Sequence, residues 1–166
     1  MNLSFLRNAF RTDVPYWRAI VTLSALAIVP SIGFVLIAFA ILALLGVDAV
    51  ESAPELPVND PAFIFLAIVV GPLVETALLV VVLKVIGLVV ESANARSGVS
   101  GIGWGVAHGI QAPPWFFGTF WSFFVFSRAY LAWRKISRSR GFGAACLPHA
   151  IQNTVAFALI RLDGSV

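Results

Sequence analysis

Apolar residues in this chain fall into five long segments that short polar stretches separate. The segments cover residues 19–47, 62–90, 100–112, 115–133 and 141–160. A hydrophobic run of about 20 residues has the length of a helix that crosses the hydrocarbon core of a bilayer. The pattern predicts an all-α fold: a polytopic bundle of about five transmembrane helices, forming one membrane domain over residues 1–166.

Residues 1–17 precede the first apolar segment and mix aromatic with charged side chains. Leu3, Leu6 and Phe10 recur at near-helical spacing, which is typical of a helix in the headgroup layer. We therefore expect an N-terminal interfacial helix over this segment.

Composition and charge place the chain in a membrane. Hydrophobic residues make up 60% and charged residues 11% of the sequence, against about 45–50% and 25% in an average soluble domain. The net charge of +3 comes from basic residues beside the apolar segments, whereas the loop at 48–60 is acidic. With five spans, the basic loops fall on one side, so the positive-inside rule predicts a cytoplasmic N-terminus. Because the rule already explains these basic residues, we expect no nucleic-acid partner.

Two segments carry patterns that predict how they pack. Gly101, Gly105 and Gly109 repeat every four residues, a ridge of small side chains that lets another helix approach closely. The segment 115–133 is crowded with aromatic side chains instead. We expect these rings to contact lipid and to anchor the helix at the membrane interface.

Four polar residues inside the apolar segments are candidates for chemistry. Glu75 lies near the middle of its segment, where an ionisable group is costly unless it faces a cavity or a partner. His108 lies in the third segment, and His149 and Asn153 share one helix face in the fifth because they are four residues apart. Their depths along the helices are compatible with one layer near the bilayer midplane.

An acid and two imidazoles in such a layer could hydrolyse an amide. Glu75 would activate a water molecule as a general base, and His149 and Asn153 would donate hydrogen bonds to the developing oxyanion. His108 would orient the water, or bind a divalent metal such as Zn²⁺ jointly with Glu75 and His149. Each residue alone also suits hydrogen bonding between helices, and the set also suits a metal or proton pathway.

Three runs in order, GPLVETALL, WGVAHG and LPHAIQN, resemble the motifs of the CAAX protease and bacteriocin-processing (CPBP) family of intramembrane proteases. The resemblance covers about residues 65–157, within a core of residues 62–161. It implies that Glu75 is the water-activating glutamate, and that His108, His149 and Asn153 are the residues of the second and third motifs. It also implies a bacterial inner membrane.

The chain departs from the family pattern at two positions. The second glutamate of the first motif is Thr76 here, and its arginine is Val80. We expect an intramembrane peptidase of the metalloprotease type, whose partners are membrane lipids and a peptide or protein substrate. The alternatives are a catalytically inactive relative that serves as a structural subunit beside other membrane proteins, and a metal or proton pathway.

Overall fold

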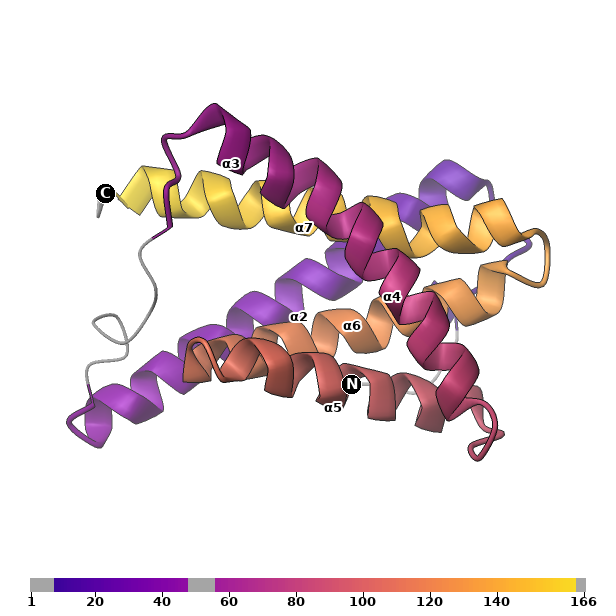
Figure 1. Ribbon diagram of the computed structural model, residues 1–166, viewed down its shortest axis with the longest axis horizontal. Coiled ribbons are helices and arrows are strands. Elements are labelled where there is room, and N and C mark those ends of the chain that lie inside the picture. The colour runs from indigo at the N-terminus through magenta and orange to yellow at the C-terminus, as the bar shows by residue number, and fades with distance from the viewer. Residues whose placement is uncertain (1–7, 48–55, 164–166) are drawn as a thin grey trace.

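The computed structural model describes residues 8–47 and 56–163, and helices account for nearly all of that part. The elements are α2 (Tyr16–Leu44), α3 (Pro61–Phe65), the π-helical turn η1 (Leu66–Val70), α4 (Gly71–Ile86), α5 (Ala93–Gly109), α6 (Pro113–Trp133) and α7 (Arg138–Asp163). The described residues form no strand, so the all-α prediction is confirmed. In Figure 1, α7 lies along the top, α5 along the bottom, and the α3–α4 helix crosses the view diagonally.

Three helical stretches are long and apolar enough to cross a membrane. They cover Tyr16–Leu44, Pro61–Ile86 and Arg138–Leu162, with 29, 26 and 25 residues. α5 has 17 residues, and at 1.5 Å per residue it is about 25 Å long, somewhat less than a hydrocarbon core. The described residues therefore contain three of the five predicted spans by this criterion, as expected for a membrane protein.

Polar side chains set where the helices begin. The Asp60 carboxylate accepts a hydrogen bond from the Ala62 backbone N–H at 2.9 Å and so caps the start of α3. The Ser92 hydroxyl accepts one from the Ala95 N–H at 3.4 Å, and α5 therefore begins well before residue 100, where the apolar pattern predicted it. A cap of this kind extends a helix into sequence that is not apolar.

The second long helix contains a π-helical turn just before a proline. η1 separates α3 from α4, and Pro72 follows it in the first turn of α4. A proline ring clashes with the carbonyl four residues earlier and provides no N–H to bond it. The wider π turn accommodates this ring without ending the helix, and single π turns are frequent at functional sites.

α6 is the central helix of the bundle rather than a lipid-facing one. It packs against α2, α4, α5 and α7. Phe123, Phe126 and Trp133 on it are 3%, 1% and 0% exposed, although Phe117 is exposed. The expectation that its aromatic side chains contact lipid was wrong for these residues. A helix that is hydrophobic on all sides is buried. Here the neighbouring helices, rather than lipid, cover most of α6.

The glycine ridge on α5 brings that helix close to α6, as predicted. A Cβ atom at Gly101 would lie 2.6 Å from the Phe120 carbonyl oxygen. Cβ atoms at Gly105 and Gly109 would lie 3.0 Å from the Phe120 Cβ and 2.9 Å from the Phe116 Cβ. Side chains at these positions would push the two helices apart, so the glycines make this packing possible.

The predicted interfacial segment, residues 1–17, falls partly outside the described residues, because the description begins at residue 8. Ala9 and Phe10 are buried in the core of the bundle, at 7% and 8% exposure. The Arg128 guanidinium lies 5.0 Å from the centre of the Phe10 ring. This end of the segment therefore packs on protein.

Candidate functional site

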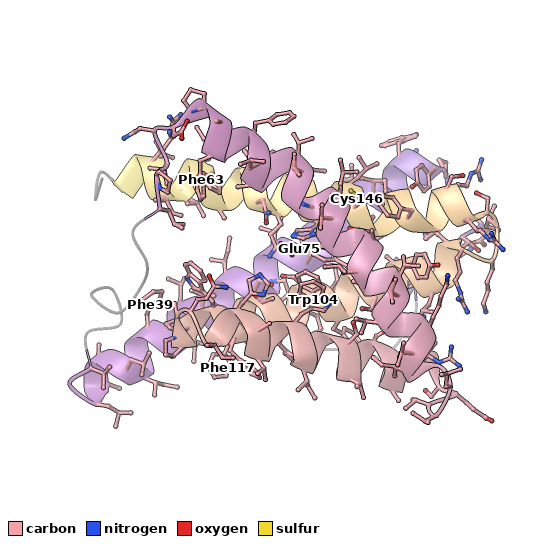
Figure 2. All side chains as sticks on the ribbon, viewed as in Figure 1. Phe39, Phe63, Glu75, Trp104, Phe117 and Cys146 are labelled. Carbon is pink, nitrogen blue, oxygen red and sulfur yellow. The ribbon has the colours of Figure 1, made fainter. Side chains whose placement is uncertain are left out.

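One cleft between the helices collects all four predicted site residues. It has a volume of ≈ 540 Å³, and its lining includes Glu75 of α4, His108 of α5, and His149 and Asn153 of α7. Figure 2 labels Glu75 near the middle of the bundle, where the α4 ribbon passes in front of the deeper helices. The structure thus brings an acid and two imidazoles from three helices to one open space.

Glu75 and His149 form the one pair of titratable side chains within 4 Å of each other in the described lining of the cleft. The Glu75 Oε2 atom lies 3.7 Å from the His149 Nε2 atom, and the two side chains are 27% and 6% exposed. This distance is too long for a direct hydrogen bond. Neither Glu75 Oε2 nor His149 Nδ1 has a hydrogen-bond partner among the described residues. Both groups are therefore available to a third polar group in the cleft.

Aromatic rings from α6 fix the orientation of the His149 imidazole. The ring stacks on Phe126 with 5.0 Å between centroids and meets the edge of Phe123 at 5.2 Å. His149 follows Pro148, which lies within α7 and is fully buried. The imidazole is consequently held as tightly as a core side chain while one of its nitrogens faces Glu75.

His108 lies in the wall of the cleft and is held by its own helix. Its Nδ1 atom lies 2.9 Å from the Trp104 carbonyl oxygen. A carbonyl only accepts, so Nδ1 is the donor and Nε2 remains for another partner. The His108 ring is 6.0 Å from the Phe123 ring, which also contacts His149.

The three predicted metal ligands line one cleft but are not grouped as a preformed metal site. Within residues 8–47 and 56–163, no three His, Cys, Asp or Glu side chains lie close enough together to hold an ion. Glu75 and His149 are neighbours, and His108 keeps its Nε2 atom for another partner because its Nδ1 atom donates to the Trp104 carbonyl, as is usual for a histidine that binds a metal. A metal held by Glu75, His108 and His149 together stays a prediction.

Asn153 ties α7 to the π-helical turn. Its Nδ2 atom donates a hydrogen bond to the Ala67 carbonyl oxygen at 2.8 Å. Ala67 lies in η1, where the wide turn changes the pattern of backbone bonds. One N–H of the Asn153 amide thus joins two helices. The second N–H and the amide oxygen remain for a partner in the cleft that Asn153 lines.

Three further polar residues of the cleft form a hydrogen-bonded network that was not predicted. The Gln152 Nε2 atom donates to the Ser122 hydroxyl at 2.6 Å, and Ser122 is 2.8 Å from the Ser31 hydroxyl. The Gln152 Oε1 atom is buried and has no partner among the described residues. Gln152 could have been found from the sequence, because it lies three residues from His149 on the same helix face. In the sequence, Ser31 and Ser122 are typical of small residues that pack between helices. Their hydrogen bond becomes apparent only when α2 and α6 are placed side by side.

The cleft has one polar end and long apolar walls. Polar groups gather around Glu75, His149 and Gln152, and most of the remaining lining is aliphatic or aromatic. The apolar part of the lining comes mainly from α2 and from the last turns of α7, including Ile28, Ile32, Val35, Leu36, Phe39, Phe157, Leu159 and Ile160. Such a lining can receive an apolar molecule or segment that presents one polar group to Glu75 and His149.

Neither of the positions at which the chain departs from the CPBP pattern faces the cleft. Thr76 is 2% exposed within the bundle. Val80 packs against the hydrophobic core, and neither residue is in the cleft lining.

Comparison with models of protein families, with curated proteins and with solved structures finds no match to this chain.

Proposed function

We propose that this chain is an intramembrane peptidase that hydrolyses a peptide bond with a water molecule activated by Glu75. The observation that carries the proposal is a set of three buried polar atoms without partners on one cleft. These atoms are Glu75 Oε2, His149 Nδ1 and Gln152 Oε1. Leaving such atoms unpaired is costly, and an unpaired buried polar atom is expected where a residue serves function rather than packing.

The residues divide the reaction between them. Glu75 accepts a proton from water, whose oxygen then forms a bond to the carbonyl carbon of the substrate. The His149 imidazole N–H and the second N–H of the Asn153 amide stabilise the negative oxygen of the tetrahedral intermediate. The C–N bond then breaks as the proton on Glu75 passes to the leaving amine. His108 Nε2 can accept from the water, and Asn153 holds η1 against α7.

The steps above use only the chain's own side chains. A divalent metal, were one bound, would be held by Glu75, His108 and His149 and would lower the pKa of the attacking water. The CPBP resemblance remains a ground for the reaction class through its three ordered motifs. The peptide or protein substrate would enter along the apolar walls of the cleft, with its scissile bond at the polar end.

We also propose five spans with the N-terminus in the cytoplasm, in a bacterial inner membrane. The charges support this orientation. The loop joining α6 to α7 carries Arg134 and Lys135, and the start of α2 carries Arg18 at the same end of the bundle. Asp60 lies at the opposite end, at the start of α3. Basic loops favour the cytoplasmic side.

A second candidate function is that of a structural subunit without catalytic activity. The observation that favours it is the identity of two residues: an uncharged Thr76, buried in the bundle, and Val80 stand where the CPBP pattern has its second glutamate and its arginine. Such a chain would be found in fixed proportion with other membrane proteins.

The test compares membranes from cells that express the wild-type chain, Glu75→Gln or the control Glu91→Gln. Newly formed peptide N-termini are labelled chemically and identified by mass spectrometry. Glu91 is an exposed glutamate just beyond α4, so its replacement changes the same charge without touching the cleft. We expect products that depend on the wild-type chain, persist with Glu91→Gln, and fall by at least ~100-fold with Glu75→Gln. Equal products from all three chains would refute the peptidase.

A further inference from the structure

The structure has a second cavity, which shares no lining residue with the cleft described above. Its volume is ≈ 610 Å³. The cavity, which we call the basic pocket, is lined by Val80, Lys84, Tyr130, Arg134, Lys135, Arg138, Ser139 and Phe142. Four of these side chains are cationic, and none is a carboxylate.

The residues that line the basic pocket come from three helices and their ends. Lys84 lies in the last turn of α4, Arg134 caps the end of α6, and Arg138 opens α7. In Figure 1 all three helix ends lie on the right-hand side of the bundle, with the end of α4 below the other two. Gly141 keeps the connection tight, because a Cβ atom there would lie 2.8 Å from the Arg134 backbone.

The positive charges of the basic pocket are not neutralised within the described part of the protein. The ion pairs there are Arg11 with Asp13 and His149 with Glu75, and neither involves a residue of the pocket. The cations around the pocket repel one another, and a bound anion would offset this repulsion by attracting each of them. Arginine forks and a lysine ammonium are well suited to the oxygens of a phosphate group.

From these observations we propose that the basic pocket binds the phosphate of an anionic phospholipid headgroup. A lipid fits better than free phosphate because the pocket has an apolar side, formed by Val80 and Phe142. Beside it, Val81 and Val85 of α4 are 55% and 60% exposed, which provides a surface for an acyl chain. Basic pockets between helices at the cytoplasmic end of membrane proteins bind anionic headgroups in this way.

The test measures lipid retention by the purified full-length chain in detergent, using native mass spectrometry. Phosphatidylglycerol is titrated against phosphatidylcholine, and inorganic phosphate is added in a separate series. The test variant is Lys84→Gln/Arg138→Gln. The control is Arg18→Gln/Arg140→Gln, which removes the same charge at the same end of the bundle from exposed residues outside the pocket. Circular dichroism checks that each variant is helical, and Lys84→Gln alone replaces a double variant that does not fold.

We expect the wild-type chain and the control to bind phosphatidylglycerol more tightly than phosphatidylcholine. Loss of two cations is expected to weaken that binding by about 30-fold. Equal binding by the test variant and the control would overturn the proposal, and so would equal binding of the two lipids. If inorganic phosphate displaces the lipid at matched concentration, the pocket is a site for free phosphate and the lipid assignment is wrong. Because the basic pocket is separate from the cleft, these outcomes do not depend on peptidase activity.

Discussion

His149 is packed like an apolar ring although it carries two polar nitrogens. It is 4% exposed, it lies between Phe123 and Phe126, and its Nδ1 atom has no partner among the described residues. A buried polar atom without a partner costs about 1–3 kcal/mol of stability. An apolar side chain would serve the packing at least as well, and departures of this kind are expected at functional sites.

This reasoning predicts that His149→Phe separates stability from function. The variant should unfold at the same temperature as the wild-type chain or a higher one, because it removes an unsatisfied nitrogen and keeps the aromatic stacking. The N-terminal products of the proposed peptidase should disappear. Thermal unfolding in detergent, followed by tryptophan fluorescence, measures the first effect. A melting temperature several degrees lower would assign His149 a structural role instead.

At the scale of the helices, one side-chain hydrogen bond joins the π-helical turn η1 to α7. Asn153 donates to the Ala67 carbonyl, which lies in η1 two turns before Glu75. The contact fixes the height of α4 relative to α7 and so helps to place Glu75 beside His149. The position of the carboxylate is therefore linked to the irregular turn that Pro72 requires.

Replacing Asn153 by alanine should destabilise the bundle by about 1–3 kcal/mol, because the Ala67 carbonyl loses its partner in a partly buried interface. The neighbouring Thr154→Ala is the matched control. The Thr154 hydroxyl bonds to Ala150 within its own helix and is exposed, so its loss should cost less than ~0.5 kcal/mol. Chemical unfolding in mixed micelles measures both. Similar losses in the two variants would contradict the role given to Asn153.

The contact between α5 and α6 gives a second prediction. Gly101→Ala should destabilise the chain by about 1–3 kcal/mol, because the new methyl group would meet the Phe120 backbone. Gly103→Ala serves as control, since a Cβ atom there has no neighbour within 4 Å. That variant should be neutral or slightly stabilising through higher helix propensity. Equal unfolding temperatures would show that the helices are not in close contact.

The helices were largely predictable from the sequence, and the errors have physical causes. Long apolar segments located the long helices, but Ser92 starts α5 early because a side-chain cap is independent of hydrophobicity. The burial of Phe123 and Phe126 on α6 could not be predicted. Lipid and a protein interior are equally apolar, so composition does not distinguish a helix at the centre of a bundle from one at its edge.

The candidate site was predictable only where a residue is out of place in a membrane. Glu75, His108 and His149 stand out because ionisable groups are costly at that depth, and all three line the cleft. Ser31 and Ser122 carry no such signal. A serine can satisfy its hydroxyl within its own helix, so its part in a network between helices depends on which helices are neighbours.

At the scale of the whole molecule, the two ends of the bundle differ in charge, which predicts its orientation. With Cys146 replaced by alanine, a single cysteine at Asn59 should react with an impermeant maleimide from outside the cell. A single cysteine at Ser139 should react after the membrane is permeabilised. Both positions are exposed, and they lie at opposite ends of the helices. The reverse pattern would contradict a cytoplasmic basic end.

The central claim is that water reaches the polar end of a cleft within the membrane-spanning bundle. The chain contains two histidines, so the imidazole signals of the histidine-labelled protein in bilayers can be assigned with one His149→Phe variant. Solid-state NMR that transfers magnetisation from water measures contact with the His149 ring directly. We predict rapid transfer to His149 although its side chain is 6% exposed. Transfer to the His149 ring as slow as transfer to the buried side chains of α6 would contradict the account.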